Sequence, residues 1–387
     1  MNNQELRNQM ISWRRYLHQI PETAFEEIET SKFVSEKLRE MGYEVETGIG
    51  KTGVVASLTV GDGNESIGLR ADIDAINMQE TNSFSYTSKT PGKMHACGHD
   101  GHTTMLLGAA KLLAERKDFN GTVRLIFQPA EEPGKGAQAM IDDGLFERFP
   151  IDEIYGLHNM PSIPEGRIHT RAGGIMASED NFVIKIKGKG AHASSPHLGI
   201  DPLVLASQII LGLQTIVSRN VSPLKQAVIS CTELHTDGVR NAIPSNVVIL
   251  GDTRSFAPEV QEQIETRMRS ISQSICEMNG AGCEFEYTHE FAPTVNWEGQ
   301  VNIASKAAIN IVGKDKVDDN CEPFTGSEDF GTFLRHVPGC FLFLGTGKNE
   351  NASDNIPLHN SIYDFNDDVL EIGAEFFAEL IRLRLPK

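Results

Sequence analysis

Three histidines and a cysteine are crowded between His95 and His102, immediately before a stretch of aliphatic residues. Within this cluster Cys97 and His99 are one residue apart, so a loop or an extended chain could turn both side chains toward one metal. Thiolate and imidazole together favour zinc or a similar transition metal. The same residues also fit a zinc knuckle, a redox thiol, or the polar start of a helix that carries incidental histidines.

The surrounding sequence narrows these alternatives. No second Cys/His pair follows at the short spacing of a zinc knuckle, and no second cysteine stands nearby as in a thioredoxin-like motif. A polar helix start and a metal site completed by distant residues both remain. His95 and His102 are expected to support such a site or to line the mouth of the helix predicted over 103–116.

Two adjacent carboxylates, Glu131 and Glu132, follow an apolar run in the segment QPAEEPGKGA. Such a pair is a common surface feature, but in a metallohydrolase one carboxylate can bind metal while its neighbour accepts the proton of the attacking water. His158 and His359 are isolated, and each alone is more often a structural residue than a ligand. Together these segments supply five candidate ligands, enough for two metals that share a bridge: Cys97, His99, Glu132, His158 and His359.

These residues need a scaffold that brings them together. Apolar periodicity predicts helices over 5–20, 25–41, 103–116 and 135–146, and strands over 53–58, 66–74 and 122–132. Strands that alternate with helices indicate an α/β fold, in which a largely parallel sheet is covered by helices on both faces. Reactive groups of such sheets lie beyond the carboxyl ends of the strands. The predicted strand ends carry Asp72, Asp74, Glu131, Glu132 and His158.

The pattern changes near residue 177. The sequence then predicts a strand, a long helix, two more strands and a helix over 258–279, the β-α-β-β-α order of a small inserted α/β domain. The first pattern resumes with a helix over 300–312, a buried strand over 340–345 and a final helix over about 366–383. We therefore predict a catalytic domain formed by 1–176 and 295–387, interrupted by an inserted domain over 177–294.

Charge and composition disfavour several classes of protein. The chain has 35 Lys and Arg residues against 53 Asp and Glu residues, and the net charge of −18 opposes binding to nucleic acid or to an anionic membrane. The first residues lack a signal-peptide pattern, and no run approaches the roughly 18 apolar residues of a membrane-spanning helix. We expect a cytoplasmic protein without nucleic-acid or membrane partners, in which six scattered cysteines form no disulfide scaffold.

Eight motifs occur along the chain in the order and spacing of a known family: LRADIDA, MHACGHDGHTTMLLGAA, LIFQPAEEPGKGA, GLHNMP, GKGAHASSPHLGIDP, RNAIPSN, GSEDF and PLHNSIYDFND. Over nearly its whole length the chain resembles the bacterial and plant amidohydrolases that include hippurate hydrolase, auxin-amino-acid conjugate hydrolase and N-acetyl-diaminopimelate deacetylase. This family is a branch of the aminoacylase and carboxypeptidase-like metallohydrolases. The resemblance implies hydrolysis of the amide bond of N-acyl-L-amino acids to a carboxylic acid and a free amino acid.

The resemblance also implies roles for individual residues. Two divalent metal ions, of Zn, Mn, Co or Ni, would be held by Cys97, His99, Glu132, His158 and His359, with Cys97 as the bridge. Glu131 would be the catalytic base, and Asp72 a supporting carboxylate that orients a ligand imidazole. His192 would reach the active site of the partner subunit and stabilise the oxyanion, and Asn241 would contact the substrate.

The implied fold is a zinc-exopeptidase-like domain with a mixed, mostly parallel sheet between helices, interrupted by a smaller ferredoxin-like domain through which a homodimer forms. The substrate stays open: N-acetyl-diaminopimelate, N-acetylcysteine and dipeptides are alternatives to hippurate-like, N-acetyl or indole-acetyl conjugates. A non-catalytic metal-binding relative is the alternative from another class. The presence of Glu131 beside Glu132 disfavours it, because a binding protein needs no base next to a ligand.

Overall fold

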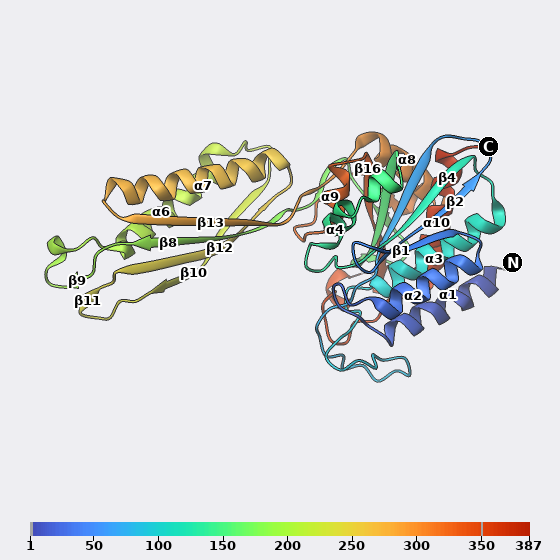
Figure 1. Ribbon diagram of the computed structural model, residues 1–387, viewed down its shortest axis with the longest axis horizontal. Helices are drawn as coiled ribbons and strands as arrows, with labels where there is room; N and C mark the ends of the chain where they lie inside the picture. The colour runs from blue at the N-terminus through green and yellow to red at the C-terminus, as the bar shows by residue number, and fades with distance from the viewer. Residues whose placement is uncertain (1–2, 350) are drawn as a thin grey trace. The chain divides into compact units, whose positions relative to one another are not determined.

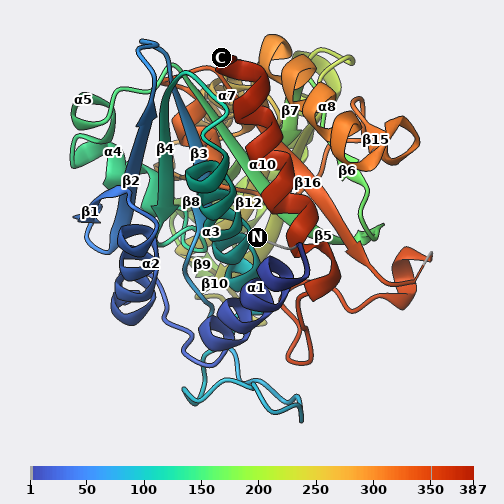
Figure 2. The same ribbon diagram turned by 90° about the vertical axis from the view of Figure 1, so that its right-hand side faces the viewer.

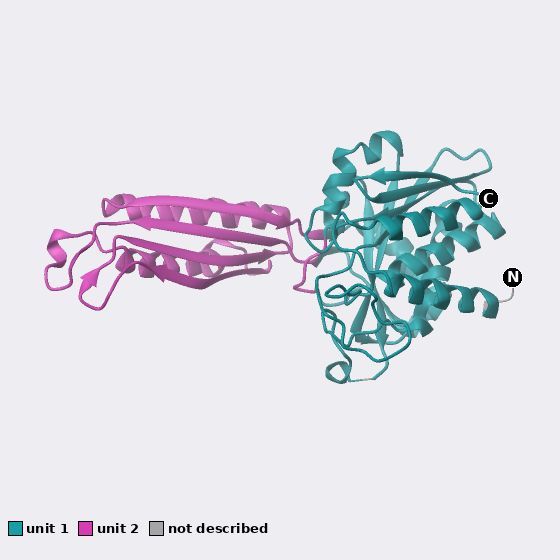
Figure 3. Ribbon diagram, turned by 60° about the horizontal axis from the view of Figure 1, so that its bottom comes forward, with its two compact units in different colours: residues 1–175, 295–323, 329–387 teal, residues 176–294, 324–328 magenta. Residues whose placement is uncertain are grey.

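The computed structural model describes residues 3–349 and 351–387, and the chain divides into two compact units (Figure 3). The first unit comprises Met1–Ile175, Val295–Pro323 and Asp329–Lys387, and the second comprises Met176–Thr294 and Phe324–Glu328. Two of the points at which the chain changes unit lie in strands β7 (Gly173–Met176) and β14 (Thr294–Asn296), and the other two flank Phe324–Glu328.

The short segment 324–328 departs from the predicted boundaries, which put all of 295–387 in the first unit. Phe324 forms a parallel bridge with Met176, and the Ala177 N–H donates to the Gly326 carbonyl oxygen over 3.0 Å. These backbone contacts hold the segment against the start of the second unit. Backbone pairing of this kind leaves no hydrophobic period in the sequence from which it could be predicted.

An eight-stranded sheet forms the centre of the first unit, in the order β1-β2-β4-β3-β5-β16-β6-β15. The central strands β4, β3, β5 and β16 run parallel, whereas β1, β2 and β6 are antiparallel to a neighbour. β3 and β16 are buried along their whole length, as expected of central strands covered on both faces. The strands span Glu44–Ile49 (β1), Gly53–Val60 (β2), Ser66–Asp72 (β3), Gly121–Gln128 (β4), Glu153–Pro164 (β5), Ile168–His169 (β6), Val317–Asp318 (β15) and Gly339–Gly347 (β16). The predicted mixed, mostly parallel sheet is confirmed.

Helices cover both faces of this sheet (Figures 1 and 2). On one face α2, α3, α8 and α10 pack against the strands, and α1 packs on α3 and α10; α4 and α9 cover the other face. Neighbouring helices surround α3, which accounts for its continuous aliphatic run. The helices span Asn3–His18 (α1), Ile28–Glu40 (α2), His99–Arg116 (α3), Gly136–Asp142 (α4), Leu145–Arg148 (α5), Glu298–Val312 (α8), Phe330–Leu334 (α9) and Leu370–Arg384 (α10).

Three predicted boundaries near the strand ends are wrong, and backbone geometry explains each. The helix predicted from residue 103 begins at His99, after Gly98 takes the left-handed conformation (φ 93°) at its N-cap. The strand predicted to residue 132 ends at Gln128, where a proline removes the next ladder donor. The helix predicted over 135–146 is divided into α4 and α5 at Gly144, which has a φ of 81°.

The second unit has the order β8-α6-β10-β12-α7-β13 and an antiparallel sheet of four strands, β10-β12-β8-β13. Its two helices pack on this sheet around a separate apolar core. The β-α-β-β-α-β arrangement is ferredoxin-like and one strand longer than the predicted pattern. The elements span Glu179–Lys187 (β8), Pro202–Thr215 (α6), Ala227–Thr236 (β10), Asn246–Ser255 (β12), Pro258–Met278 (α7) and Gly282–Phe291 (β13), and a small ribbon adds Ala191–His192 (β9) and Ala242–Ile243 (β11).

Helix α6 is strongly apolar, and a π-helical turn follows it. By length and composition alone Pro202–Asn220 could cross a membrane, with a mean hydropathy of 1.3. Ile209 and Leu213, however, are buried in the core of the second unit, so packing against the sheet explains part of this apolar character. Val204 and Leu211 on the same helix are exposed.

Candidate metal centre

The candidate ligands gather where the parallel strands of the first unit end. β3 ends at Asp72 and pairs with β5 as far as Arg70 and Gly156, so Asp72 and His158 stand at one level two residues farther on. The sequence predicts His158 at a strand end, but it lies inside β5, which continues to Pro164 beside β16. His158 lies at the site because it stands beside the end of β3, not because β5 ends there.

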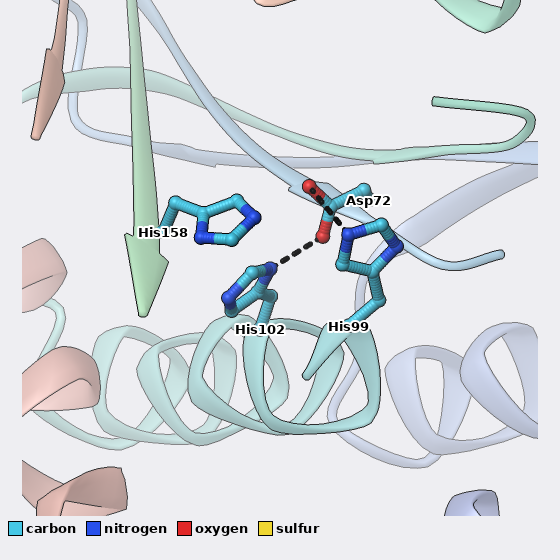
Figure 4. Close-up of side chains that lie close together, drawn as sticks. All are labelled: Asp72, His99, His102 and His158. Atoms are coloured by element: carbon cyan, nitrogen blue, oxygen red, sulfur yellow. Dashed lines mark hydrogen bonds and ion pairs between the residues drawn. The ribbon is translucent and has the colours of Figure 1, made fainter. Parts of the chain in front are cut away.

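Helix α3 faces these strand ends with its first turn, which carries His99 and His102. Figure 4 shows both imidazoles beside Asp72 and His158, with side chains that converge from β3, α3 and β5. All four side chains are buried. One possible ligand atom of each lies within 4.8 Å of the others, a spacing at which they could surround a metal ion.

A second group that shares His99 contains Cys97 and Glu132, again with ligand atoms within 4.8 Å of one another. His99 Nε2 lies 3.9 Å from Glu132 Oε1. Both atoms are buried; His99 Nε2 has no hydrogen-bond partner among the described residues, and Glu132 Oε1 has none beyond the 3.4 Å approach of His359 Nε2. Buried polar atoms are rarely left unpaired unless an ion or another unseen group satisfies them. These two atoms therefore fit a cation between them.

The remaining two predicted ligands border this group. His158 Nε2 lies 3.5 Å from Cys97 Sγ, and His359 Nε2 lies 3.4 Å from Glu132 Oε1. The structure thus brings all five predicted ligands into one continuous cluster. Their thiol, imidazole and carboxylate donors are those of divalent transition-metal sites, and the set fits two such ions.

Hydrogen bonds aim two of the imidazoles at the cluster. His99 Nδ1 donates to Asp74, with 2.9 Å to the carbonyl oxygen and 3.2 Å to the carboxylate, and His158 Nδ1 donates to the Asn159 carbonyl oxygen over 2.7 Å. An Nδ1–H held in this way leaves Nε2 of a neutral ring with a free lone pair for a metal. Asp74 also accepts the Glu132 N–H over 3.0 Å, so one carboxylate fixes two candidate ligands.

Asp72 contacts an imidazole outside the five predicted ligands. Its Oδ1 lies 2.6 Å from His102 Nδ1 and its Oδ2 accepts a hydrogen bond of 2.8 Å from Arg70, whereas His99 Nε2 is 3.8 Å away. The hydrogen bond of Asp72 thus goes to His102, and its role in orienting a ligand imidazole stays a prediction. Because α3 begins at His99, about one turn earlier than predicted, His102 lies in the first turn of the helix, within reach of Asp72.

Burial and neighbouring charge shift the pKa values of this cluster. Burial alone would raise the pKa of Asp72, but His99, His102 and Arg70 outweigh it and hold that pKa well below its usual range. Burial, with His102 nearby, lowers the pKa of His158, so this ring is in the neutral form that binds metal. Burial and the Glu132 carboxylate raise the pKa of the Cys97 thiol, which a bound cation would counteract.

Glu131 stands beside the same cluster. Its Oε2 lies 3.9 Å from His99 Nε2, and its side chain is buried. The residue before it, Ala130, has a φ of 50°, and its N–H donates to the buried carboxylate of Glu27 over 2.9 Å. His359 likewise has a positive φ, of 57°. Such strain in residues other than glycine is concentrated at functional sites.

Sequence reasoning missed the residues that orient the ligands. Asp74 was noted only as a strand-end carboxylate, and Asn159 and Tyr363 were not singled out. Asn159 Oδ1 lies 2.5 Å from His102 Nε2, and its amide donates to the Tyr363 hydroxyl over 2.6 Å. The only signal in the sequence was adjacency, because each missed residue lies within four positions of Asp72, His158 or His359.

His192 and Asn241 belong to the second unit. The structure brings them together on the β9–β11 ribbon, where His192 pairs with Ala242 and the Asn241 carbonyl oxygen accepts the Ala193 N–H over 3.0 Å. The His192 side chain is exposed, and its Nδ1 lies 2.8 Å from Ser194 Oγ. Their catalytic roles stay predictions.

The chain matches known proteins over most of its length. Residues 68–383 match the model of peptidase family M20/M25/M40. Hippurate hydrolase of Campylobacter jejuni is 41% identical over 376 residues, which cover 97% of this chain and 96% of the relative. N-acetyl-L-cysteine deacetylase of Bacillus subtilis is 42% identical over 351 residues, covering 89% of this chain and 82% of the relative.

A solved structure is also similar. The Bacillus subtilis YXEP protein, described as a dinuclear metal-binding peptidase of the M20 family, is 34% identical and superposes with a TM-score of 0.85 over 99% of both chains. The resemblance read from the eight motifs is confirmed by these matches. On its sequence, its fold and its cluster of ligands, the chain belongs to peptidase family M20/M25/M40.

Proposed function

We propose that this chain is a metal-dependent amidohydrolase that cleaves N-acyl-L-amino acids into a carboxylic acid and a free amino acid. One observation carries the proposal: His99 Nε2 has Glu131 Oε2 and Glu132 Oε1 at the same distance, 3.9 Å. One carboxylate can therefore act as a metal ligand while its neighbour stays within reach of the attacking water. A protein that only binds metal has no use for the second carboxylate.

The chain's own residues divide the work. Glu132 would hold the metal ions together with Cys97, His99, His158 and His359. When bound, the ions supply Lewis acidity, which makes water nucleophilic near neutral pH and polarises the acyl carbonyl. Asp74 and Asp72 would keep the surrounding imidazoles in place through the hydrogen bonds that they accept.

Glu131 would carry the proton. It would take a proton from the attacking water as the water oxygen bonds to the acyl carbon, and return it to the nitrogen as the C–N bond breaks. The partner subunit's His192 would donate to the developing oxyanion, and Asn241 would contact the substrate. Both assignments rest on the family resemblance of their motifs.

The substrate class follows from the names of the relatives. Hippurate and N-acetyl-L-cysteine are both amino acids with an acylated nitrogen, and the proteins named for hydrolysing them are 41% and 42% identical to this chain. N-acetyl-diaminopimelate and dipeptides are the competing substrates. A cytoplasmic location completes the proposal.

A homodimer through the second unit is part of the proposal. Val204 and Leu211 on α6 are 52% and 71% exposed, and Val228 and Leu234 are exposed on β10, an edge strand of the four-stranded sheet. A second copy could cover the apolar helix face and pair with the free strand edge.

Removal and return of metal tests the function. The protein is stripped with a chelator, reloaded with Zn, Mn, Co or Ni, and assayed with N-acetyl, N-benzoyl and N-indole-acetyl amino acids and with dipeptides. We expect two ions per chain, loss of hydrolysis on stripping, and recovery with at least one metal on the N-acyl amino acids. Full loading with metal but no hydrolysis of any substrate would favour the non-catalytic alternative.

A further inference from the structure

We infer that Arg14 and His18, on the buried side of α1, act as positioning residues that hold together the three chain segments bearing Cys97, His99 and His359. We call this pair the α1 strut. Neither residue belongs to the ligand cluster, and the resemblance gives no role to either. The inference rests on the proposed metal-dependent function, because it concerns how the same site is built.

His18 joins α3 to the long connection that precedes it. Its ring is fully buried, with Nδ1 2.7 Å from Asp100 Oδ2 and Nε2 3.3 Å from Glu80 Oε1. Asp100 follows His99 in the first turn of α3, and Glu80 lies in the connection between β3 and α3 that contains Cys97. With a carboxylate at each nitrogen, both nitrogens must donate, which is the geometry of an imidazolium ion.

Arg14 joins the same helix start to the segment that carries His359. Its guanidinium is fully buried and donates to Asp364 over 2.8 Å and to Asp367 over 2.7 Å, while Nη1 lies 3.6 Å from Asp100 Oδ2. Asp100 therefore faces both members of the α1 strut. The guanidinium carbon also lies 4.8 Å from the centre of the Tyr86 ring.

Tyr86 closes the arrangement, because its hydroxyl donates to Asp364 over 2.7 Å. The connection over 73–98 and the segment over 357–366 contain no helix or strand in the described chain. Backbone hydrogen bonds join the two segments at separate points, from His359 N–H to the Ala96 carbonyl oxygen and from Thr81 N–H to the Ser361 carbonyl oxygen, both over 2.9 Å. Between these points the buried side-chain ion pairs help to set the course of the chain. Desolvation offsets much of the attraction within a buried ion pair, but removal of one partner leaves an uncompensated buried charge. The geometry of the joined segments therefore depends on both partners.

The test compares Arg14→Met and His18→Gln with Arg7→Met as the matched control. Arg7 is on the same helix and pairs with Asp368, next to Asp367, over 2.5 Å, but this pair is partly exposed and does not reach Asp100 or Glu80. Each protein is loaded with Co(II), and three properties are measured: the thiolate-to-cobalt absorption band, the metal affinity by chelator competition, and kcat and KM separately. Circular dichroism and the unfolding midpoint report the fold.

We expect the two strut variants to lose metal affinity by about 10- to 100-fold, the range seen when groups that orient ligands are removed. Their cobalt band should shift, and kcat should fall with little change in KM, whereas Arg7→Met should match the wild type. Arg14→Lys, which keeps the charge, should recover part of the affinity. If a strut variant does not fold, Glu80→Gln removes one carboxylate of the same network and should change the band in the same direction.

Folded variants with the wild-type cobalt band and wild-type metal affinity would overturn the α1 strut. A wild-type protein that binds cobalt but hydrolyses no N-acyl amino acid would overturn the proposed function instead. The two failures are therefore distinguishable.

Discussion

At the scale of single residues, the site is organised around one imidazole. His99 Nε2 faces the carboxylates of Asp72, Glu131 and Glu132 at 3.8 to 3.9 Å, while Nδ1 is held by Asp74. None of the three carboxylates is close enough to accept a hydrogen bond from Nε2. An imidazole whose Nε2 faces three carboxylates without a hydrogen bond to any of them is arranged to bind a cation. The other candidate ligands lie around this group.

The pH dependence of stability should report His18. Burial lowers the pKa of His18, but Asp100 and Glu80 outweigh this and raise it from the usual 6.5 to about 9. A raised pKa in the folded state means that the stabilisation is complete below about pH 6.5 and is lost as the pH rises through about 9. Each pKa unit is worth about 1.4 kcal/mol, so the free energy of unfolding should lose on the order of 3 kcal/mol over this window.

Urea unfolding of the wild type and of His18→Gln at pH 6, 7.5 and 9.5 checks this expectation. The stability gap between the two proteins should be widest at pH 6 and should narrow toward pH 9.5. A gap that stays constant over this range would show that His18 does not titrate in the folded protein as its surroundings predict.

At the scale of elements, the site depends on turns more than on the strands they follow. The turn after β4 carries Glu131 and Glu132, and its close packing requires Gly136. A Cβ atom at Gly136 would lie 1.6 Å from the Pro129 carbonyl oxygen, so a larger residue there would force the backbone to move. The Gly136 N–H also donates to the Ala130 carbonyl oxygen over 2.9 Å, so any such movement reaches the catalytic turn.

Gly136→Ala should therefore lower both stability and turnover. We expect a loss of about 2 kcal/mol or more in the free energy of unfolding, as is typical when a substitution forces backbone displacement. Gly299→Ala is the control, because a Cβ there meets nothing within 4 Å, in the first turn of α8. Thermal unfolding and hydrolysis rates of both variants decide the matter: equal behaviour would mean that the turn is not constrained as described.

The elements that sequence patterns predicted are those with a strong apolar period. The sequence predicts four such elements, β2, β3, α3 and α10, whose apolar residues are buried against the elements around them. β1 was missed because its sequence, EVETGI, is mostly polar and exposed at the sheet edge. The sequence does not predict the start of α3, because the residues HDGH carry no apolar period. They are buried, and their polar side chains are paired with His18 and Asp72, which only the fold brings near.

The candidate ligands could be named from the sequence, whereas the residues that aim them could not. The types and motifs of the cysteine, the histidines and the paired glutamates indicate metal chemistry. Asp74, Asn159 and Tyr363 act through hydrogen bonds that depend on strand register and on the course of irregular segments. No spacing rule relates residues 159 and 363, so their contact required a structure.

At the scale of the whole molecule, the two units have separate cores and different tasks in this account. The ligand cluster lies in the first unit, and the exposed apolar side chains of α6 and β10 lie in the second. Replacement of Leu211, 71% exposed, by glutamate should therefore disrupt a homodimer that forms through α6. Ile28→Glu is the control, since Ile28 is 65% exposed on α2 of the first unit.

Analytical ultracentrifugation measures the oligomeric state of these proteins directly. We expect the wild type and Ile28→Glu to sediment as dimers and Leu211→Glu to shift toward monomer. If Leu211→Glu dimerises as strongly as the wild type, the α6 face does not form the interface.

We propose Glu131 as the base for hydrolysis of N-acyl amino acids, beside a metal centre held by other residues. The measurement that tests it most directly is the turnover of Glu131→Gln on an N-acyl amino acid, with bound metal quantified in the same sample. We expect both metal ions to be retained while kcat falls by roughly 10²- to 10⁴-fold, the usual contribution of a general base. A Glu131→Gln enzyme with full metal content and wild-type turnover would contradict it.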